Sequence, residues 1–389
     1  MKAAPDSSRG GVLLVANYDS NVGFAWWLME SFWVKLAEHY AERNVFLAFP
    51  QISRVSESIQ SSSINVVEID FSKTVIGNIA AQLGFLRRHR IRLIYFSDMS
   101  TWHWRFVLYR LFGVRLIVVH DHTPGVRTPA RNWKAFVKRI LHKMPMFTVD
   151  GAIGATEYIR QRLVQVSCVP ADRCYAAPNG LPNNEIPPRK VQLRQLLEIP
   201  EGKKVIVMTG RAHRYKGIGF MLEVINLLPV VYKEKMHFVF IGSGPDLEYF
   251  QDMARSLQLQ NICTFAGYRS NIVSLLAGAD IAVHPSRGEV GYSLSILEYM
   301  RAGLPVIVPD NPSVCGATID GVTGIIYPEG DVPVACEALL TLLSNEQLRW
   351  QMGKAARLES LRYSLEETHR KLIQAFSEIE GKMSPGMWN

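Results

Sequence analysis

Short apolar runs alternate with longer stretches of helical spacing along most of this chain. Runs of this length, bounded by turn-forming residues, predict buried strands, and strands that alternate with helices predict a parallel sheet covered on both faces. In the first half the predicted strands are Val12–Tyr18, Val45–Phe49, Asn65–Ile69, Leu93–Phe96 and Leu116–His120. In the second half they span residues 204–209, 236–242, 262–265, 280–283 and 305–308. The pattern predicts an α/β protein with two Rossmann-like, doubly wound parallel-sheet domains.

A segment rich in proline separates the two alternations. It runs from Asn179 to Arg189 and carries three prolines and a glycine, which favour a linker. The chain has 389 residues, enough for two domains of ordinary size. We expect an N-terminal domain over residues 1–183, a C-terminal domain over 184–360 and a final helical segment over 361–389.

Two glutamates stand in a segment, residues 282–310, that predicts a strand, a turn, a helix, a short loop and another strand. Glu289 is expected on the turn, the helix is expected to begin near Gly291 to Ser293, and Glu298 is expected on the helix. A helix N-terminus attracts phosphate, and a carboxylate can accept hydrogen bonds from hydroxyls. The segment therefore suggests a nucleotide-sugar site. The alternative is a buried strand-turn-helix that binds nothing.

Two cations follow another predicted strand, residues 204–209. Arg211 comes directly after Gly210, and Lys216 follows five positions later in the same loop. Open α/β sheets bind ligands beyond the carboxyl ends of their strands. Arginine offers a planar fork to phosphate oxygens and lysine a compact charge, so the pair could neutralise a departing diphosphate. An ordinary solvated surface loop is the alternative.

The C-terminal half resembles the nucleotide-binding domain of glycosyltransferase family 4, the retaining enzymes of the two-domain GT-B fold. The resemblance covers about residues 175–330, and the order and spacing of its motifs make it specific. The matching segments are Asn179-Gly180, Gly210-Arg211, Lys216-Gly217, Ile241-Gly242-Ser243-Gly244-Pro245, Phe265-Ala266-Gly267-Tyr268, Ala279-Asp280, Pro285-Ser286, the pair Glu289 and Glu298, Ala302-Gly303-Leu304-Pro305-Val306 and Gly321-Val322-Thr323-Gly324. The resemblance implies that the substrate cleft lies between the two sheets. It also implies that the last helix packs back on the N-terminal domain.

The spacing of the two glutamates departs from the family pattern. The family usually has seven residues between them, whereas Glu289 and Glu298 are separated by eight (298 − 289 − 1). If Gly291-Tyr292-Ser293-Leu294 aligns with the family's Gly-Phe-Gly-Leu, Val290 occupies the usual glutamate position. The turn must then absorb one extra residue.

The resemblance also implies roles for single residues. Arg211 and Lys216 would stabilise the leaving diphosphate, Glu289 would bind hydroxyls of the transferred sugar, and His120 would line the sugar pocket from the acceptor domain. A histidine that only caps its strand is the alternative for His120. Glu298 would accept hydrogen bonds from the ribose. The other expected donor-binding residues are Gly210, Gly291, Tyr292, Ser293, Leu294, Gly267 and Tyr268, and the acceptor-side residues are Gly23 and Asn21.

No cofactor and no metal are expected. The nucleotide-sugar is a co-substrate, and both UDP- and GDP-sugars fit, because backbone groups usually read the base. His120-Asp121-His122 is a weak metal motif, since adjacent side chains diverge and no third ligand is evident. The chain contains no Asp-x-Asp motif, which favours metal-independent transfer.

The formal net charge of +8 lies wholly in the first half of the chain. Residues 1–185 carry 22 basic and 14 acidic side chains, and the remainder carries 21 of each. Between Arg87 and Lys143, 13 basic residues stand against two acidic ones. This balance favours an anionic partner, such as a membrane surface or a lipid-phosphate acceptor. No nucleic-acid-binding motif accompanies the cations, so we expect no nucleic-acid partner.

The stretch from Arg131 to Lys143 has helical spacing. Its apolar residues are Trp133, Phe136, Val137, Ile140 and Leu141, and cations stand around them. Such a helix can lie at a membrane surface, or its apolar face can lie in the domain core. Both alternatives stay open from the sequence.

The remaining features concern location. No apolar run is long enough to predict a transmembrane helix, and the five cysteines form no Cys-x-x-Cys pair, which favours a reducing compartment. We expect a cytoplasmic protein, with peripheral attachment to the inner face of the cell membrane as one option.

The function predicted from these features is that of a retaining, hexosyltransferase-type enzyme. It would move a sugar from a nucleotide-diphosphate sugar to a glycan acceptor, a lipid-linked or polysaccharide precursor at the membrane surface. The alternatives are a nucleotide-sugar epimerase or hydrolase of the same fold, and a non-catalytic scaffold that binds sugar nucleotides or membranes.

Overall fold

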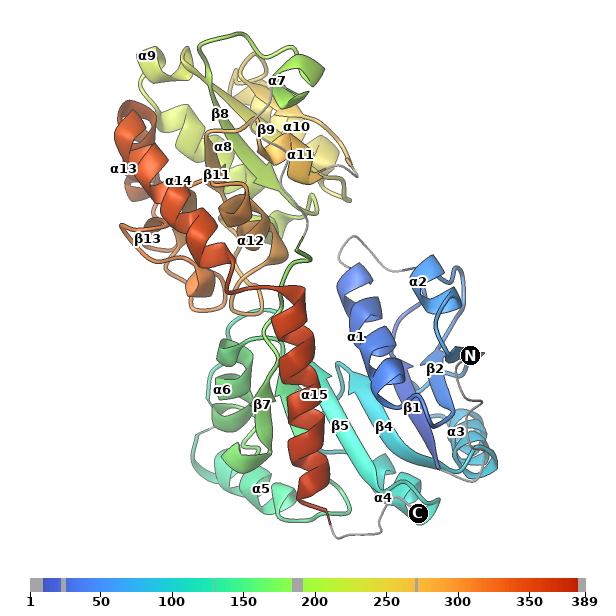
Figure 1. Ribbon diagram of the computed structural model, residues 1–389. Helices are drawn as coiled ribbons and strands as arrows, with labels where there is room; N and C mark the ends of the chain where they lie inside the picture. Colours follow the sequence, from blue (N-terminus) through green and yellow to red (C-terminus); the bar gives the residue numbers. More distant parts are fainter. Residues whose placement is uncertain (1–9, 22–25, 130, 184–191, 270–271, 384–389) are drawn as a thin grey trace. The chain divides into compact units, whose positions relative to one another are not determined.

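The computed structural model describes residues 10–21, 26–129, 131–183, 192–269 and 272–383 (Figure 1). The chain folds into two compact units. Unit 1 comprises residues 1–123, 127–179 and 366–389, and unit 2 comprises residues 124–126 and 180–365. Of the expected linker, residues 184–189 lie outside the described residues.

Unit 1 is built on a seven-stranded sheet of order β3-β2-β1-β4-β5-β6-β7, in which every pairing is parallel. Its strands are β1 (Gly11–Ala16), β2 (Val45–Phe49), β3 (Ile64–Glu68), β4 (Ile91–Ser97), β5 (Leu116–Asp121), β6 (Gly151–Gly154) and β7 (Cys174–Ala176). Its helices are α1 (Trp26–His39), α2 (Glu57–Gln60), α3 (Ile76–Arg88), α4 (Arg105–Leu111), α5 (Asn132–His142), α6 (Glu157–Gln165) and the short 3-10 helix Ala171–Arg173. The strand order reverses between β1 and β4, the kind of point at which open α/β sheets bind ligands.

Unit 2 contains a six-stranded parallel sheet of order β10-β9-β8-β11-β12-β13. Its strands are β8 (Lys204–Thr209), β9 (Met236–Ile241), β10 (Cys263–Phe265), β11 (Ile281–Val283), β12 (Val306–Pro309) and β13 (Gly324–Tyr327). Its helices are α7 (Gln192–Leu196), α8 (Ile218–Leu227), α9 (Val230–Lys233), α10 (Leu247–Ser256), α11 (Ile272–Leu276), α12 (Leu294–Arg301), α13 (Val332–Ser344) and α14 (Glu346–Ser360), with 3-10 turns at Arg214–Lys216 and Cys315–Ala317. The order again reverses at the first strand, between β8 and β11.

Both sheets confirm the predicted α/β fold class, and the observed strands differ from the expected ones mainly at their ends. β1 ends at Ala16, two residues before the predicted end, because Tyr18 turns away to donate a hydrogen bond to Asp98. The alternation in the first half also missed β6 and β7, which are only four and three residues long. Strands this short carry too few positions for a pattern to register.

The last helix, α15 (Leu365–Gly381), packs on the sheet of unit 1, the unit to which residues 366–389 belong. The Phe376 ring lies 5.9 Å from the Tyr95 ring of β4. A methyl group at Gly151 of β6 would come within 2.2 Å of the Ile379 side chain, so the glycine lets that side chain lie directly on the strand. No helix within the described ranges combines the length and apolarity needed to cross a bilayer.

Candidate nucleotide-sugar site

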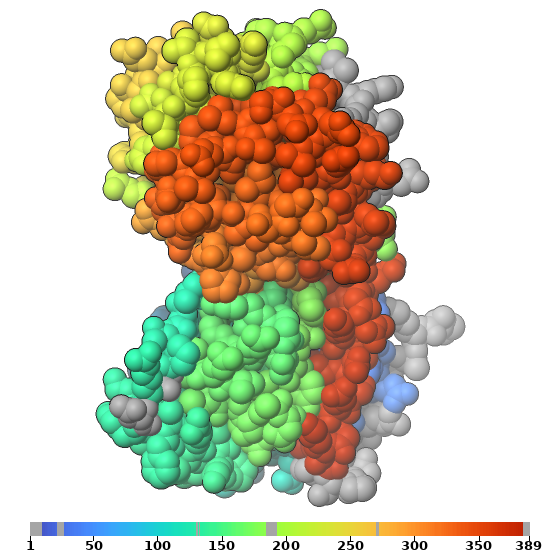
Figure 2. All heavy atoms as spheres, turned by 90° about the vertical axis from the view of Figure 1, so that its left-hand side faces the viewer, coloured from blue at the N-terminus to red at the C-terminus, as the bar shows by residue number. Residues whose placement is uncertain are grey.

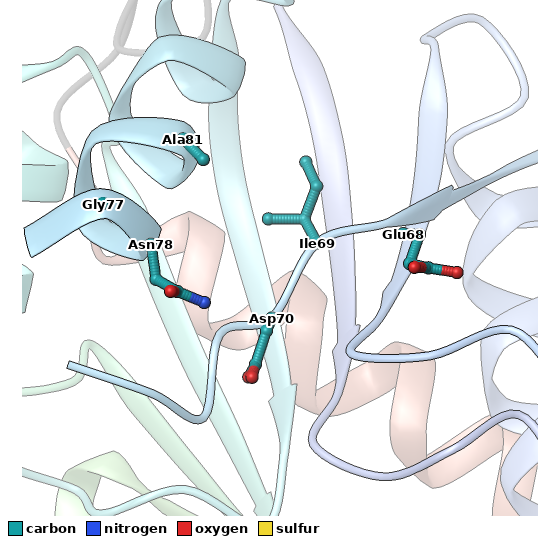
Figure 3. Close-up of a pocket in the computed structure, with 6 residues that line it drawn as sticks. All are labelled: Glu68, Ile69, Asp70, Gly77, Asn78 and Ala81. Carbon is teal, nitrogen blue, oxygen red and sulfur yellow. The ribbon is translucent and has the colours of Figure 1, made fainter. Parts of the chain in front are cut away.

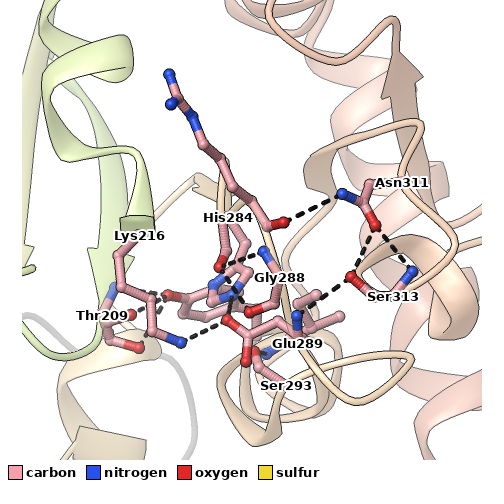
Figure 4. Close-up of polar contacts among 12 residues, drawn as sticks. Thr209, Lys216, His284, Gly288, Glu289, Ser293, Asn311 and Ser313 are labelled. Carbon is pink, nitrogen blue, oxygen red and sulfur yellow. Dashed lines mark hydrogen bonds and ion pairs between the residues drawn. The ribbon is translucent and has the colours of Figure 1, made fainter. Parts of the chain in front are cut away.

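Three ionisable side chains meet at the carboxyl edge of the unit 2 sheet (Figure 4). Lys216 ends the 3-10 turn that follows β8, His284 comes directly after β11, and Glu289 lies on the turn before α12. His284 Nε2 lies 3.0 Å from Glu289 Oε1, and the Lys216 ammonium donates to the same oxygen. Because β8 and β11 are neighbours in the sheet, their carboxyl ends bring these loops together.

Burial and charge set the protonation of this cluster. Burial raises the pKa of Glu289. The Lys216 ammonium and the His284 hydrogen bond lower the pKa by more than burial raises it, so that it falls to about 2. Burial lowers the pKa of His284 despite the neighbouring carboxylate. At neutral pH the cluster is therefore a carboxylate held by an ammonium and by a neutral imidazole that donates from Nε2.

The turn that carries Glu289 is fastened to the loop after β12. Asn311 Oδ1 accepts from both the amide and the hydroxyl of Ser313, at 2.9 and 2.7 Å. The Ser313 hydroxyl accepts from the Glu289 amide at 3.3 Å, and the Ser313 carbonyl accepts from Gly291 at 2.7 Å. Gly291 has φ +112°, a conformation that favours glycine, so the chain can turn sharply into α12.

Sequence reasoning missed His284, Asn311 and Ser313. A signal was present, because His284 directly follows β11, and Asn311 and Ser313 follow the neighbouring strand β12. Polar side chains at the carboxyl ends of adjacent parallel strands meet at one edge of the sheet.

The start of α12 lies where the sequence places it. Ser293 is the N-cap, and its hydroxyl accepts from the Ile296 amide at 3.3 Å. The amides of Leu294 and Ser295, in the first turn, have no partner within the helix. Tyr292 is buried beside this start, with its ring edge-on to Tyr363 at 5.1 Å. The cap and the two amides make this end suited to an anion.

Glu298 lies on α12 and is half-buried. Burial raises the pKa of its carboxyl to about 7. Within the described parts of the chain its carboxylate has no hydrogen bond and no ion pair. Lys216, in the same unit, pairs with Glu289 instead. A half-buried carboxylate without a protein partner is costly, and hydroxyl groups of a ligand could satisfy it.

The loops after β8, β9 and β10 supply the other predicted donor-side residues. Gly210, directly after β8, has φ +148°, and a methyl group there would meet nothing within 4 Å. Arg211 is exposed, and the described residues offer its guanidinium no hydrogen bond or ion pair. Gly267, after β10, accepts through its carbonyl from the Gly242 amide at 2.9 Å, and Tyr268 is exposed. The surface above Gly210 is thus open beside an exposed cation.

His120 lies in unit 1, at the end of β5. It is fully buried, its Nδ1 lies 2.6 Å from the Tyr95 hydroxyl, and its Nε2 has no partner among the described residues. Burial lowers its pKa, which keeps the imidazole neutral. Its ring also packs on Phe32 and, at 4.0 Å, on His122.

The other residues named from the sequence fall in the first half of the chain. Asp121 pairs with Arg162 at 3.1 Å instead of joining His120 and His122, and no group of three potential metal ligands occurs in the described ranges. Asn21 is exposed, and its amide donates to Asp19 at 2.8 Å. Gly23 lies outside the described residues.

Sequence reasoning missed Asp98, which follows β4 beside His120. Its carboxylate accepts from the Tyr18 hydroxyl and, at 2.6 Å, from the His122 amide. Its backbone has φ +59°, which is unusual for a residue with a side chain.

A separate hollow of about 230 Å³ lies in unit 1 between the end of β3 and the start of α3 (Figure 3). Glu68, Asp70 and Asn78 supply its polar lining. The Asp70 carboxylate is already occupied by the Ser72 amide and hydroxyl. None of the residues that the sequence predicts for the site lines this hollow.

Comparison with known proteins relates this fold and this site to a family. Residues 190–359 match the family model of glycosyl transferases group 1. The alpha-D-kanosaminyltransferase of Streptomyces kanamyceticus is 25% identical over 285 residues, which are 70% of this chain and 73% of that protein.

Two further proteins are similar to this chain, one in sequence and one in structure. An N,N'-diacetylbacillosaminyl-diphospho-undecaprenol alpha-1,3-N-acetylgalactosaminyltransferase of Campylobacter jejuni is 27% identical over 179 residues, 46% of this chain and 45% of that protein, so the match spans about half of each. The structure of HepE of Anabaena, in complex with UDP and glucose, has a TM-score of 0.73 at 16% identity and covers 95% of this chain and 99% of that one.

The two parallel sheets and the solved structures that they resemble define the class of this protein, the GT-B fold. Within that class, residues 190–359 are similar to the glycosyl transferases group 1, and the named relatives are glycosyltransferases.

Proposed function

We propose that this protein is a retaining glycosyltransferase that transfers a hexosyl group from a UDP- or GDP-sugar to an acceptor hydroxyl. One observation carries the proposal: an ion-paired Lys216 and Glu289 lie beside a capped helix start, and Glu298 on that helix has no partner in the described chain. Cation, helix amides and unpaired carboxylate match the diphosphate and the ribose hydroxyls of such a donor.

The diphosphate would bind at the start of α12. The amides of Leu294 and Ser295 would donate to one phosphate, and the exposed Arg211 guanidinium and the Lys216 ammonium would bind the other. Negative charge grows on the leaving phosphate as the glycosidic bond breaks, so these donors act mainly in the transition state. Glu298 would accept from the ribose hydroxyls, and the backbone near Gly267 and Tyr268 would flank the base.

Glu289 would serve the transferred sugar although it stands one residue before the usual position. Lys216 and His284 both engage Oε1, and Oε2 has no partner in the described parts of the chain. Oε2 is therefore the oxygen left for a sugar hydroxyl, while Oε1 keeps Lys216 in place. His120, whose Nε2 has no partner among the described residues, would line the sugar pocket from unit 1.

We propose that the acceptor attacks from the face that the phosphate leaves, with the departing phosphate taking the acceptor's proton. The protein's cations would do the work that a divalent metal does elsewhere, a hypothesis supported by the lack of an Asp-x-Asp motif in the sequence. No further cofactor is needed for this transfer.

The acceptor would be a lipid-linked or polysaccharide precursor, met by a cytoplasmic protein at the inner face of the membrane. The excess of positive charge in the first half of the chain supports this choice. The Campylobacter relative, whose name includes a diphospho-undecaprenol acceptor, is consistent with it.

Calorimetric titration with UDP, GDP and ADP, with and without EDTA, tests the donor site. We expect micromolar binding of one nucleotide that EDTA does not change and that Glu298→Ala abolishes. Glu223→Ala, which removes an exposed carboxylate on α8, is the matched control and should bind normally. No binding of any nucleotide, or equal binding by both variants, would overturn the assignment.

A further inference from the structure

Helix α5 in unit 1 packs Ala135 and His142 against the protein and leaves most of its large apolar side chains in solvent. Ala135 and His142 are 7% and 3% exposed, whereas Trp133 and Phe136 are 68% and 63% exposed. Two alternatives were open for this helix, and these exposures exclude an apolar face in the core. In Figure 2, atoms of α5, in blue-green, form part of the outer surface of unit 1.

The exposed apolar residues form a single stripe, which we call the α5 face. It consists of Trp133, Phe136, Val137, Ile140 and Met144. The spacing i, i+3, i+4 and i+7 places the first four on one side of a helix that turns about 100° per residue, and Met144 follows two residues after the helix ends at His142.

The opposite side of α5 is firmly attached, so the α5 face points outward in the folded unit. His142 Nδ1 lies 2.6 Å from the Thr148 hydroxyl, and its Nε2 lies 3.1 Å from the Ser167 carbonyl. The Lys138 ammonium donates to the Val166 carbonyl at 2.7 Å. These bonds would have to break for the helix to turn its apolar side inward.

Cations stand on both sides of the α5 face. At about 100° per residue, Lys134 lies on one side of the stripe, and Arg139 and Lys143 lie on the other. All three are exposed, and none forms an ion pair within the described ranges. Unpaired cations around an exposed tryptophan give the surface a strong preference for a partner that is both apolar and anionic.

We propose that the α5 face docks on the surface of an anionic lipid bilayer. Trp133 and Phe136 would enter the boundary between headgroups and acyl chains, and Lys134, Arg139 and Lys143 would contact lipid phosphates. The 13 basic and two acidic residues between Arg87 and Lys143 extend the same charge complementarity around the helix.

This docking deepens the proposed function, because it names the part of unit 1 that would bring the protein to a membrane-borne acceptor. The role of this docking in catalysis rests on the proposed function, whereas the docking itself does not. Binding of lipid by unit 1 and binding of nucleotide by unit 2 can be measured separately on the same full-length protein.

Flotation with vesicles of phosphatidylcholine alone, or of phosphatidylcholine mixed with the anionic phosphatidylglycerol, tests the proposal. We expect the protein to float only with anionic vesicles and to be released when the salt concentration rises. Trp133→Ala/Phe136→Ala should weaken partitioning at least about tenfold, and Lys134→Ala/Arg139→Ala about tenfold to thirtyfold.

The matched control is Trp350→Ala on α14, which also removes an exposed tryptophan near a lysine but lies in unit 2. It should float like the wild type. Equal flotation of the Trp133→Ala/Phe136→Ala variant, or formation of a dimer in solution that this variant abolishes, would overturn the proposal. A cooperative thermal unfolding curve like that of the wild type shows that each variant is folded. Failure of the wild type to bind nucleotide would refute the proposed function while leaving lipid docking standing.

Discussion

At the scale of single residues, the site depends on charges that the protein holds away from water. Lys216 and Glu289 neutralise each other at the sheet edge, with His284 as the third partner. Glu298 lacks such a partner in the described chain, and burial raises the pKa of its carboxyl to about 7. An unpaired half-buried carboxylate destabilises the unliganded fold, and such residues are typical of binding sites.

The first prediction concerns the two cations after β8. Arg211→Ala and Lys216→Ala should each lower turnover by roughly 10²–10³, because each removes a donor to the charge that develops on the leaving phosphate. Turnover is measured with sugar donors of the nucleotide that calorimetry identifies. Arg214→Ala, in the same loop, removes an exposed arginine that stacks on Tyr249 and should leave turnover nearly unchanged. Near-normal rates in both Arg211→Ala and Lys216→Ala would contradict their assignment.

The second prediction concerns pH and Glu298. Its pKa of about 7 means that protonation begins to remove the acceptor near neutrality, so nucleotide affinity should fall as the pH drops from about 8 to 6. Glu298→Gln should bind weakly at every pH in this range and show no such slope. A wild-type affinity that is constant from pH 8 to 6 would contradict this role for the carboxylate.

The same shift has a consequence for stability. The pKa of Glu298 is higher in the folded than in the unfolded chain, so the folded state is favoured at low pH and loses stability as the pH rises to about 7. Glu298→Gln should therefore stabilise the unliganded protein by on the order of 1–3 kcal/mol at pH 8, and by much less near pH 5. Chemical denaturation at the two pH values measures the difference, and an equal effect at both would be inconsistent with the raised pKa.

At the scale of elements, the start of α12 combines a structural cap with the expected phosphate contacts. Ser293→Ala should cost about 1 kcal/mol of unfolding free energy, since it removes the acceptor for the Ile296 amide. It should also weaken nucleotide binding, because the first turn then frays. Asp331 caps α13 by accepting from the Val334 amide at 3.0 Å, so Asp331→Ala is a control with a similar loss of stability and unchanged affinity.

At the scale of the whole molecule, each unit closes with segments that are far apart in the sequence. The packing of α15 on unit 1 joins the last part of the chain to its first strands and helices, with Phe376 fully buried against Tyr95 and Tyr40. Phe376→Ala should lower the unfolding free energy by about 3–4 kcal/mol, as expected for a buried phenylalanine. Leu361→Ala, at an exposed position, should change it by less than about 0.5 kcal/mol. Denaturant unfolding measures both changes in free energy. A Phe376→Ala change as small as that of Leu361→Ala would show that α15 adds little to the stability of unit 1.

The sequence by itself determined the class of the fold, and it placed Glu289 on a turn and Glu298 on the following helix. Apolar runs between amphipathic stretches predict parallel sheets because a strand buried on both faces must be apolar at every position. The residues from β11 to Glu298 likewise placed the turn and the start of α12, since these are local features of the chain.

Only the tertiary structure decided which partners these residues have. His284, Asn311 and Ser313 join the site because strand order makes their loops neighbours, which local spacing does not encode. The same applies to Asp121, which pairs with Arg162 instead of forming a triplet with the histidines, and to α5, whose amphipathic pattern is the same whether its apolar side faces the core or the solvent. A local pattern fixes which side of a helix is apolar, and the contacts of its other side decide where that face points.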